Sequence, residues 1–269
     1  MKLRQATELE QLFPDNRESG ETRIRKCQLA MIRMLKIFDY LSKKYEFNYW
    51  LEAGTLLGAV RNKGFVPWDC DIDLGMLRED FNKFMYKAAH ELPDDIFLQT
   101  TETDPYYHRE GVAKLRDKYS NYAGWAAKRP GLQYHNGLQV EFCIRDHVYK
   151  KPVANSLNML MSGIKKALNF SKFISYWRFY FLSRDHIFPL KYLEFEGNMY
   201  PCLNVYEAYL RFHYGEYTSL PPIEHQVPQN GCGEPFIPCN HKEILFWNEE
   251  SRLDWTKAWQ IESDVVLDL

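Results

Sequence analysis

The sequence predicts an α+β protein in which helices flank a mixed β-sheet and the C-terminal half is largely helical. Three observations lead to this fold class. Apolar residues recur at helical intervals over 24–41, polar and apolar residues alternate over 69–74 and 138–145, and two further helical stripes follow Pro152. A chain of 269 residues is long enough to bury one large core or two modest ones.

The first predicted elements surround a glycine-containing turn. From Ile24 to Leu41 apolar residues recur every three or four positions, which predicts an amphipathic helix. The short aromatic segment from Phe47 to Leu51 predicts a strand that runs into a turn at Gly54-Thr55. A brief helix is expected over 55–60. Backbone N–H groups at such a turn, together with the N-terminus of the helix, can approach an anion such as phosphate.

An acidic strand is predicted next. Residues 69–74 read Asp-Cys-Asp-Ile-Asp-Leu. Because side chains alternate along a strand, we expect Asp69, Asp71 and Asp73 on one face and Cys70 on the other.

The remaining elements of the predicted sheet carry one more carboxylate. A helix over 78–92 and strands over 96–100, 112–116 and 138–145 are expected from their apolar patterns. In the last strand the apolar side chains share one face, which leaves Glu141 in the middle of the other face.

The chain changes character after the predicted sheet. We divide it into an N-terminal extension (1–20), a core (21–150) and a helical, loop-rich region packed on the core (151–269). Five basic residues and only one acidic residue lie between positions 153 and 190: Lys165, Lys166, Lys172, Arg178, Arg184 and Asp185. Packing of the apolar stripes on the core is the favoured interpretation, and peripheral contact with an anionic membrane surface is the alternative.

Composition excludes several classes of function. Lys and Arg total 34 and Asp and Glu total 36, so the basic excess needed for bulk nucleic-acid binding is absent. The N-terminus lacks the apolar core of a secretory signal, and no stretch of about 18 apolar residues occurs, so we expect a cytoplasmic protein. The motifs of P-loop ATPases, serine hydrolases and zinc proteases are also missing. Cys232, Cys239 and His241 form at most an incomplete zinc set, and a Gly- and Pro-rich loop is the alternative interpretation.

The predicted acids suggest a site for phosphoryl transfer. Two carboxylates at positions i and i+2 of a strand point the same way, so Asp71 and Asp73 could bind one Mg²⁺ or Mn²⁺. Glu141 could complete the metal site or accept a proton, and Asp73 is the second candidate for the proton acceptor. With the turn at Gly54-Thr55, these residues could place a phosphate and neutralise its charge.

The stretch from Tyr49 to Asp80, YWLEAGTLLGAVRNKGFVPWDCDIDLGMLRED, resembles the signature of the LicD family of phosphotransferases, which is related to fukutin and the fukutin-related protein. The resemblance continues through FLQTTETDP (97–105), AKLRD (113–117), LQVEF (138–142), YLEFEG (192–197) and YLRFHYGEY (209–217). It implies that the core is a nucleotidyltransferase-like domain. It also implies transfer of a phospho-alcohol, usually phosphocholine, from a CDP-activated donor such as CDP-choline to a glycan hydroxyl, with release of CMP.

The resemblance also assigns residues. Asp71 and Asp73 match the metal-binding acids of the family, and Glu141 falls where the family usually has Asp, one methylene shorter. Gly54 and Thr55 match the turn that binds the donor phosphate. Cys70 replaces a usual Asp, but it is expected on the face opposite the metal pair.

Basic residues would hold the donor diphosphate, and the candidates are Arg61, Lys63, Lys114 and Arg116. We assign Glu196, which lies in a family motif, no chemical role. The acceptor could be a glycan or a lipid-linked precursor at the inner face of the membrane. Two other functions stay open: transfer of a nucleotide from an NTP with release of pyrophosphate, and binding of a glycan or nucleotide without catalysis.

Overall fold

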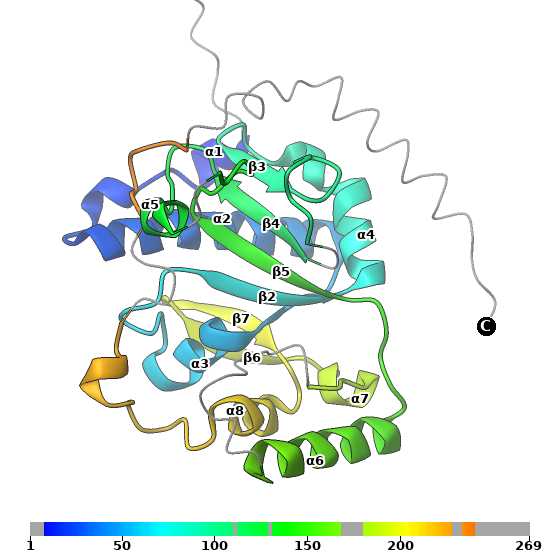
Figure 1. The fold of residues 1–269 in the computed structure, drawn as a ribbon. Helices are drawn as coiled ribbons and strands as arrows, with labels where there is room; N and C mark the ends of the chain where they lie inside the picture. Colours follow the sequence, from blue (N-terminus) through cyan, green and yellow to red (C-terminus); the bar gives the residue numbers. More distant parts are fainter. Residues whose placement is uncertain (1–7, 110–111, 129–130, 168–179, 228–232, 240–269) are drawn as a thin grey trace, which may run out of the picture.

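The structure is a computed structural model that describes residues 8–109, 112–128, 131–167, 180–227 and 233–239. Seven strands of this part of the chain form one mixed sheet in the order β3-β4-β5-β2-β1-β7-β6 (Figure 1). The strands are β1 (Trp50–Leu51), β2 (Ile72–Leu77), β3 (Ile96–Gln99), β4 (Val112–Asp117), β5 (Gln139–Arg145), β6 (Lys191–Phe195) and β7 (Asn198–Cys202). The helices are α1 (Glu8–Leu12), α2 (Arg23–Tyr45), α3 (Ala53–Asn62), α4 (Arg78–Lys87), α5 (Ala123–Ala127), α6 (Lys151–Ala167), α7 (Arg184–Ile187) and α8 (Tyr206–Tyr214).

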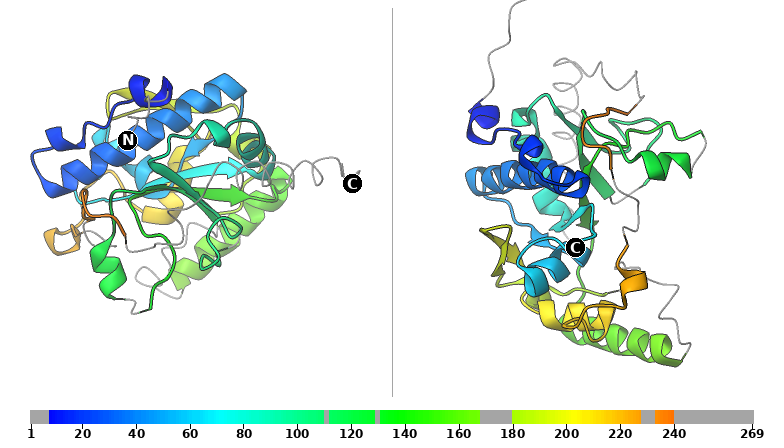
Figure 2. Two further views of the ribbon diagram at one scale, coloured as in Figure 1. Left: turned by 90° about the horizontal axis from the view of Figure 1, so that it is seen from above. Right: turned by 90° about the vertical axis from the view of Figure 1, so that its left-hand side faces the viewer.

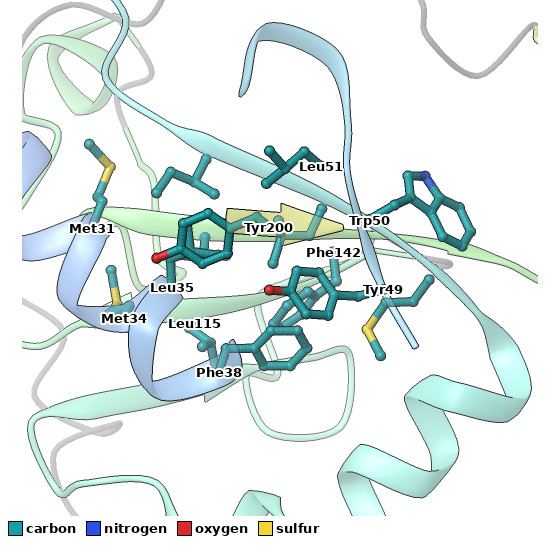
Figure 3. Packing of buried hydrophobic residues seen from close by; sticks show 14 of the residues in the cluster. Met31, Met34, Leu35, Phe38, Tyr49, Trp50, Leu51, Leu115, Phe142 and Tyr200 are labelled. Atoms are coloured by element: carbon teal, nitrogen blue, oxygen red, sulfur yellow. The ribbon is translucent and has the colours of Figure 1, made fainter. Parts of the chain in front are cut away.

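Helix α2 forms the main support of the sheet and confirms the helix predicted over 24–41. The side chain of Thr22 caps its start by accepting a hydrogen bond from the backbone N–H of Arg25 at 3.2 Å. Its apolar stripe packs on the sheet, as Figure 3 shows for Phe38 against Phe142, whose ring centroids are 4.7 Å apart. This packing fixes which face of the sheet is apolar.

The two faces of the sheet have opposite chemistry. Asp73 of β2 lies opposite Glu141 of β5, and Glu141 lies opposite Lys114 of β4. Residues that are paired across neighbouring strands project to the same face, so these three side chains share one face of the sheet. The alternate positions carry the buried apolar residues Ile72, Leu74, Ala113, Leu115, Val140 and Phe142. The register therefore gathers the charged residues on the face away from α2.

Three predicted elements differ in their limits. Strand β2 begins at Ile72 instead of position 69, because the preceding residues turn: the backbone N–H of Asp69 donates to the carbonyl of Val66 at 2.8 Å. Helix α4 ends at Lys87, and a 3₁₀ turn over Ala89–Glu91 follows it. An α-helix does not continue through Leu92, because a residue directly before a proline, here Pro93, disfavours α-helical geometry. Strand β1 has only two residues. The predicted strands over 96–100, 112–116 and 138–145 are confirmed.

The C-terminal half contributes a hairpin that the sequence analysis does not predict. Strands β6 and β7 are antiparallel and joined by Glu196 and Gly197, both with positive φ, the sign that a two-residue type I′ turn requires. Strand β7 pairs in parallel with β1, with Cys202 opposite Leu51. The region after position 150 is thus part of the same sheet as the core.

Helix α6 lies at the end of the molecule opposite α1 and β3 (Figures 1 and 2). Asn158 attaches it to the protein, since its side chain exchanges hydrogen bonds of 2.8 and 2.9 Å with the backbone of Phe181. The prediction that its apolar stripe packs on the core is wrong for Leu160 and Ile164, which are exposed, because the helix turns Ala154 and Asn158 inward instead. The second predicted stripe, with Lys172 and Arg178, falls almost wholly outside the described residues. Within the described residues, no helix combines the length and apolar character needed to cross a membrane.

Candidate active site

The predicted turn at Gly54-Thr55 is the first turn of helix α3, and it packs directly against the acidic segment. Strand β1 passes through Glu52 into α3, whose first residue, Ala53, has a φ of 46°. A Cβ at Gly54 would lie 2.6 Å from Oδ2 of Asp69, so a side chain here would require that carboxylate to move. Thr55 Oγ1 accepts a hydrogen bond of 2.8 Å from the backbone N–H of Asp73. The predicted anion-binding turn and the predicted metal pair therefore lie side by side.

The three aspartates crowd one another. Asp69, Asp71 and Asp73 are partly exposed, whereas Cys70 is buried. Burial and the negative charge of Asp71 raise the pKa of Asp69 and of Asp73 well above the usual value of an aspartate. Burial and the same acids also raise the pKa of Tyr214, at the end of α8. This segment is therefore a concentration of negative charge that would favour a bound cation.

Glu141 lies opposite Asp73 but is held by cations. Its Oε2 accepts a hydrogen bond from Lys114 Nζ and lies 3.6 Å from Arg109 Nη1. Burial alone would raise the pKa of Glu141, but Lys114 and Arg109 outweigh it and hold the pKa below its ordinary value. Burial lowers the pKa of Lys114 to about 8. Lys114 Nζ also donates to Gln139 Oε1 at 2.7 Å. Arg109 was not predicted, because its loop has no regular pattern that would show which residues point inward.

The structure places the other predicted phosphate ligands differently. Arg116 is buried and donates to Gln99 Oε1 at 2.8 Å and to the carbonyl of Gly137 at 2.7 Å. Arg61 is at the last turn of α3, 6.0 Å from the ring of Trp68, and its Nη1 reaches the carbonyl of Ser219 at 3.5 Å. Both guanidinium groups thus have partners within the protein, as Lys114 does in Glu141 and Gln139.

Comparison with known proteins identifies the family. Residues 46–204, more than half of the chain, match the LicD/FKTN/FKRP nucleotidyltransferase domain. The chain belongs to this family. The family resemblance and the nucleotidyltransferase-like α+β fold predicted from the sequence are both confirmed.

Individual similar proteins differ in how much of each chain the match covers. The chain is 25% identical to the lipopolysaccharide cholinephosphotransferase LicD of Haemophilus influenzae over an alignment of 255 residues, and the match covers 77% of this chain and 96% of that protein. It is 33% identical to an uncharacterized protein of Rickettsia typhi over an alignment of 114 residues, and the match covers 36% of this chain and 35% of that protein. It is 59% identical to the ribitol 5-phosphate transferase FKRP of Mus musculus over 33 residues, 12% of this chain and 7% of that protein.

A buried glutamate, not predicted from the sequence, also lies at this LicD-family site. Glu52 directly precedes α3, is fully buried and forms an ion pair with Arg145 of β5, and the hydroxyl of Tyr209 donates to it at 3.3 Å. Burial raises the pKa of Glu52 despite the opposing effect of Arg145. A Cβ at Gly75 would lie 2.0 Å from Trp50 Nε1, so the glycine makes room for the indole beside Glu52. Its place within the LicD-like stretch next to Gly54-Thr55 is the one signal that could have indicated Glu52.

Glu196, to which the sequence analysis gives no role, holds the segment that leads to the acids. Its carboxylate accepts hydrogen bonds from Arg25 Nη2 at 2.8 Å and from the backbone N–H of Phe65 at 3.2 Å. Its own N–H donates to the carbonyl of Lys63 at 2.9 Å. A Cβ at Gly64 would lie 2.6 Å from Glu196 Oε1. Helix α2, the β6–β7 hairpin and the loop after α3 are thus joined through one side chain.

The predicted metal set is only partly assembled. Among the described residues, no three His, Cys, Asp or Glu side chains are placed to hold a metal ion by themselves. Glu141 is bound to Lys114, which leaves Asp71 and Asp73 as the hard oxygen ligands of the predicted set. Mg²⁺ is usually held by one or two carboxylates and completed by substrate phosphate and water, so the crowded, negatively charged pair fits this ion. Of the predicted zinc residues, Cys232 and His241 lie outside the described residues.

Proposed function

We propose that the protein transfers a phospho-alcohol, phosphocholine in the first instance, from a CDP-activated donor to a hydroxyl of a glycan or its lipid-linked precursor, releasing CMP. The observation that carries this proposal is the similarity to a lipopolysaccharide cholinephosphotransferase over 96% of that protein's length. The crowded acids beside an anion-binding turn, with Lys114 on the same face of the sheet, support it. The similarity to a ribitol 5-phosphate transferase supports phospho-alcohol transfer more generally.

The proposed reaction balances without a covalent enzyme intermediate. The acceptor oxygen forms a bond to the phosphorus of the phosphocholine group, and the bond from this phosphorus to the bridging oxygen of the diphosphate breaks. The acceptor loses its proton and CMP leaves. The chain's task is then to position both substrates and to stabilise negative charge on the phosphate oxygens.

Each part of the site has a place in this proposal. Asp71 and Asp73 would hold Mg²⁺ or Mn²⁺, which would neutralise charge developing on the phosphate oxygens. Gly54 and Thr55 would bind the donor phosphate through the turn, and Lys114 would contribute a positive charge beside it. Arg61 and Arg116 stay proposed donor ligands, although each would first have to exchange a partner that it has within the protein.

Two carboxylates are proposed to accept the proton of the acceptor. Glu141 already accepts a hydrogen bond from Lys114, so it would have to release this partner before it could act as a base. Within the residues that the structure describes, no lysine is bound to Asp73 as Lys114 is bound to Glu141. Asp73 also lies next to Thr55 in the first turn of α3. Single Glu141→Gln and Asp73→Asn variants distinguish them, because loss of the base should remove the limb of the pH–rate profile that reports ionisation of the base.

A product assay on purified protein tests the function. The protein is incubated with Mg²⁺, a glycan acceptor and a panel of CDP-alcohols and NTPs, and CMP and pyrophosphate are measured. CMP release from one CDP-alcohol, abolished in Asp71→Asn, supports the proposal and identifies the alcohol. Pyrophosphate release from an NTP would show nucleotidyl transfer instead. Donor binding without any product, over a range of acceptors, would favour a binding protein.

A further inference from the structure

The loop between β3 and β4 holds a buried tyrosine hydroxyl beside the proposed active site. Tyr107 is only 2% exposed, and its hydroxyl has no hydrogen-bond partner among the residues that the structure describes. Other buried tyrosines are satisfied: the hydroxyl of Tyr49 donates to Asp39 at 2.7 Å, and that of Tyr122 donates to the carbonyl of Cys70. A buried hydroxyl without a partner is unfavourable, so its retention calls for an explanation.

The loop holds Tyr107 in a defined position. The backbone N–H of Tyr107 donates to the carbonyl of Asp104 at 2.9 Å. The carboxylate of Asp104 accepts hydrogen bonds from Gln99 Nε2 at 2.6 Å and from the backbone N–H of His135 at 2.8 Å. The ring of Tyr134 meets that of Tyr107 edge-on, with centroids 5.8 Å apart. The ring is therefore fixed by β3, by its own loop and by the segment before β5.

The surroundings of the hydroxyl are rich in positive charge. Glu141, Arg116 and Arg109 are the charged groups that act most strongly on it, and burial keeps its pKa above the usual value, so the hydroxyl stays protonated and can donate. Arg109, two positions further along the loop, is half exposed and lies 3.6 Å from Glu141. Lys114 approaches Glu141 as well. Glu141 is thus a single carboxylate beside several positively charged donors, and these donors could also bind a second anion.

We propose that Tyr107 and Arg109 form a phosphate subsite in which the Tyr107 hydroxyl and the Arg109 guanidinium donate hydrogen bonds to oxygens of the donor's diphosphate. This inference rests on the proposed function, because it takes the donor to be a nucleoside diphosphate ester. It adds two residues to those predicted from the sequence, both from a loop that has no regular pattern. The ligand supplies the acceptor that the Tyr107 hydroxyl lacks in the described part of the chain.

The Tyr107→Phe variant tests the subsite, because it removes only the hydroxyl. Thermal unfolding is measured without ligand, and binding of CDP and of pyrophosphate is measured by calorimetry in Mg²⁺. We expect an unfolding midpoint equal to or above that of the wild type, and affinity for the probe lowered about tenfold, the scale of one hydrogen bond to a charged group. Arg109→Gln should weaken binding similarly. Tyr49→Phe is the matched control: it removes a satisfied hydroxyl on the apolar side, so its midpoint should fall while affinity is unchanged.

Each other outcome has a defined meaning. A midpoint of Tyr107→Phe that falls as far as that of Tyr49→Phe shows that the hydroxyl is already satisfied, by ordered water for example, and refutes the subsite. Unchanged affinity in Tyr107→Phe refutes it as well, as does failure of the wild type to bind either probe. Pyrophosphate binding that depends on Tyr107, without CDP binding, would sustain the subsite and refute the nucleotide donor. CDP binding that depends on Tyr107, without transfer in the product assay, would refute the proposed function alone.

Discussion

Replacing Lys114 by methionine should destabilise the protein by an amount that depends on pH. Lys114 is buried, and its ammonium group donates to Glu141 and to Gln139. Methionine keeps most of the volume but removes the charge, so Glu141 loses the strongest of the groups that hold its pKa down. Burial then dominates, and the pKa of Glu141 should rise above its ordinary value of 4.5.

Protonation of Glu141 limits how far Lys114→Met can lower the free energy of unfolding. Folding with Glu141 protonated costs about 1.4 kcal/mol for each pH unit above 4.5, hence about 3 kcal/mol at pH 7 and under about 1 kcal/mol at pH 5. In the wild type the folded pKa of Glu141 lies below 4.5, so the group stays ionised in both states over this interval and adds no slope. A group whose folded pKa is raised loses stability as the pH rises. The penalty of Lys114→Met should therefore grow by up to about 2.5 kcal/mol from pH 5 to pH 7.

Urea denaturation at pH 5, 6 and 7 measures this effect. Lys63→Met is the control, since Lys63 pairs with Glu194 at 3.2 Å on the surface, and it should change the free energy of unfolding by no more than about 0.5 kcal/mol at each pH. A penalty for Lys114→Met that is the same at all three pH values would refute the reasoning, because Glu141 would then not depend on Lys114 for its charge.

Three further predictions concern the acids and their supports. Asp71→Asn should lower CMP release at least about 100-fold yet raise the unfolding midpoint measured in EDTA, because it relieves repulsion within the acidic segment; a lowered midpoint would contradict this. Glu196→Gln should cost about 1 kcal/mol in urea denaturation, whereas Glu194→Gln, at an exposed position of the neighbouring strand β6, should cost almost nothing; equal costs would remove Glu196's special role. Gly75→Ala should cost at least about 2 kcal/mol and shift tryptophan fluorescence, since its Cβ would lie 2.0 Å from Trp50 Nε1; an unchanged spectrum would argue against this packing.

The strands that carry the acids are predictable from sequence because one face of the sheet is buried. Burial against α2 imposes an alternation of polar and apolar residues, which indicates that Asp73 and Glu141 lie on polar faces. The register that sets Asp73 opposite Glu141 is not encoded in either strand alone. It arises from strand order, and the pairing of Glu141 with Lys114 arises in the same way.

The residues that sequence analysis misses depend on distant partners or on edge positions. In the sequence, Glu52 resembles an ordinary surface acid. Only the structure shows that Arg145, 93 positions later in the chain, pairs with it within the core. The β6–β7 hairpin escapes prediction because edge strand β6 exposes Tyr192 and Glu194 as well as Lys191, so it lacks a regular apolar period.

The parallel pairing of Leu51 with Cys202 also determines how late in synthesis of the chain strand β1 can gain its neighbour β7. About 150 residues separate the two positions, so at roughly 5 to 20 residues per second a ribosome needs about 8 to 30 s to make β7 after it has made β1. For most of that interval, once residue 73 has been made, the nascent chain contains Glu52 and the acidic segment but lacks the strand that covers one side of β1. A chaperone that acts during translation would be expected to bind at this stage, and slower translation of residues 52–198 would lengthen the exposure of the unfinished sheet.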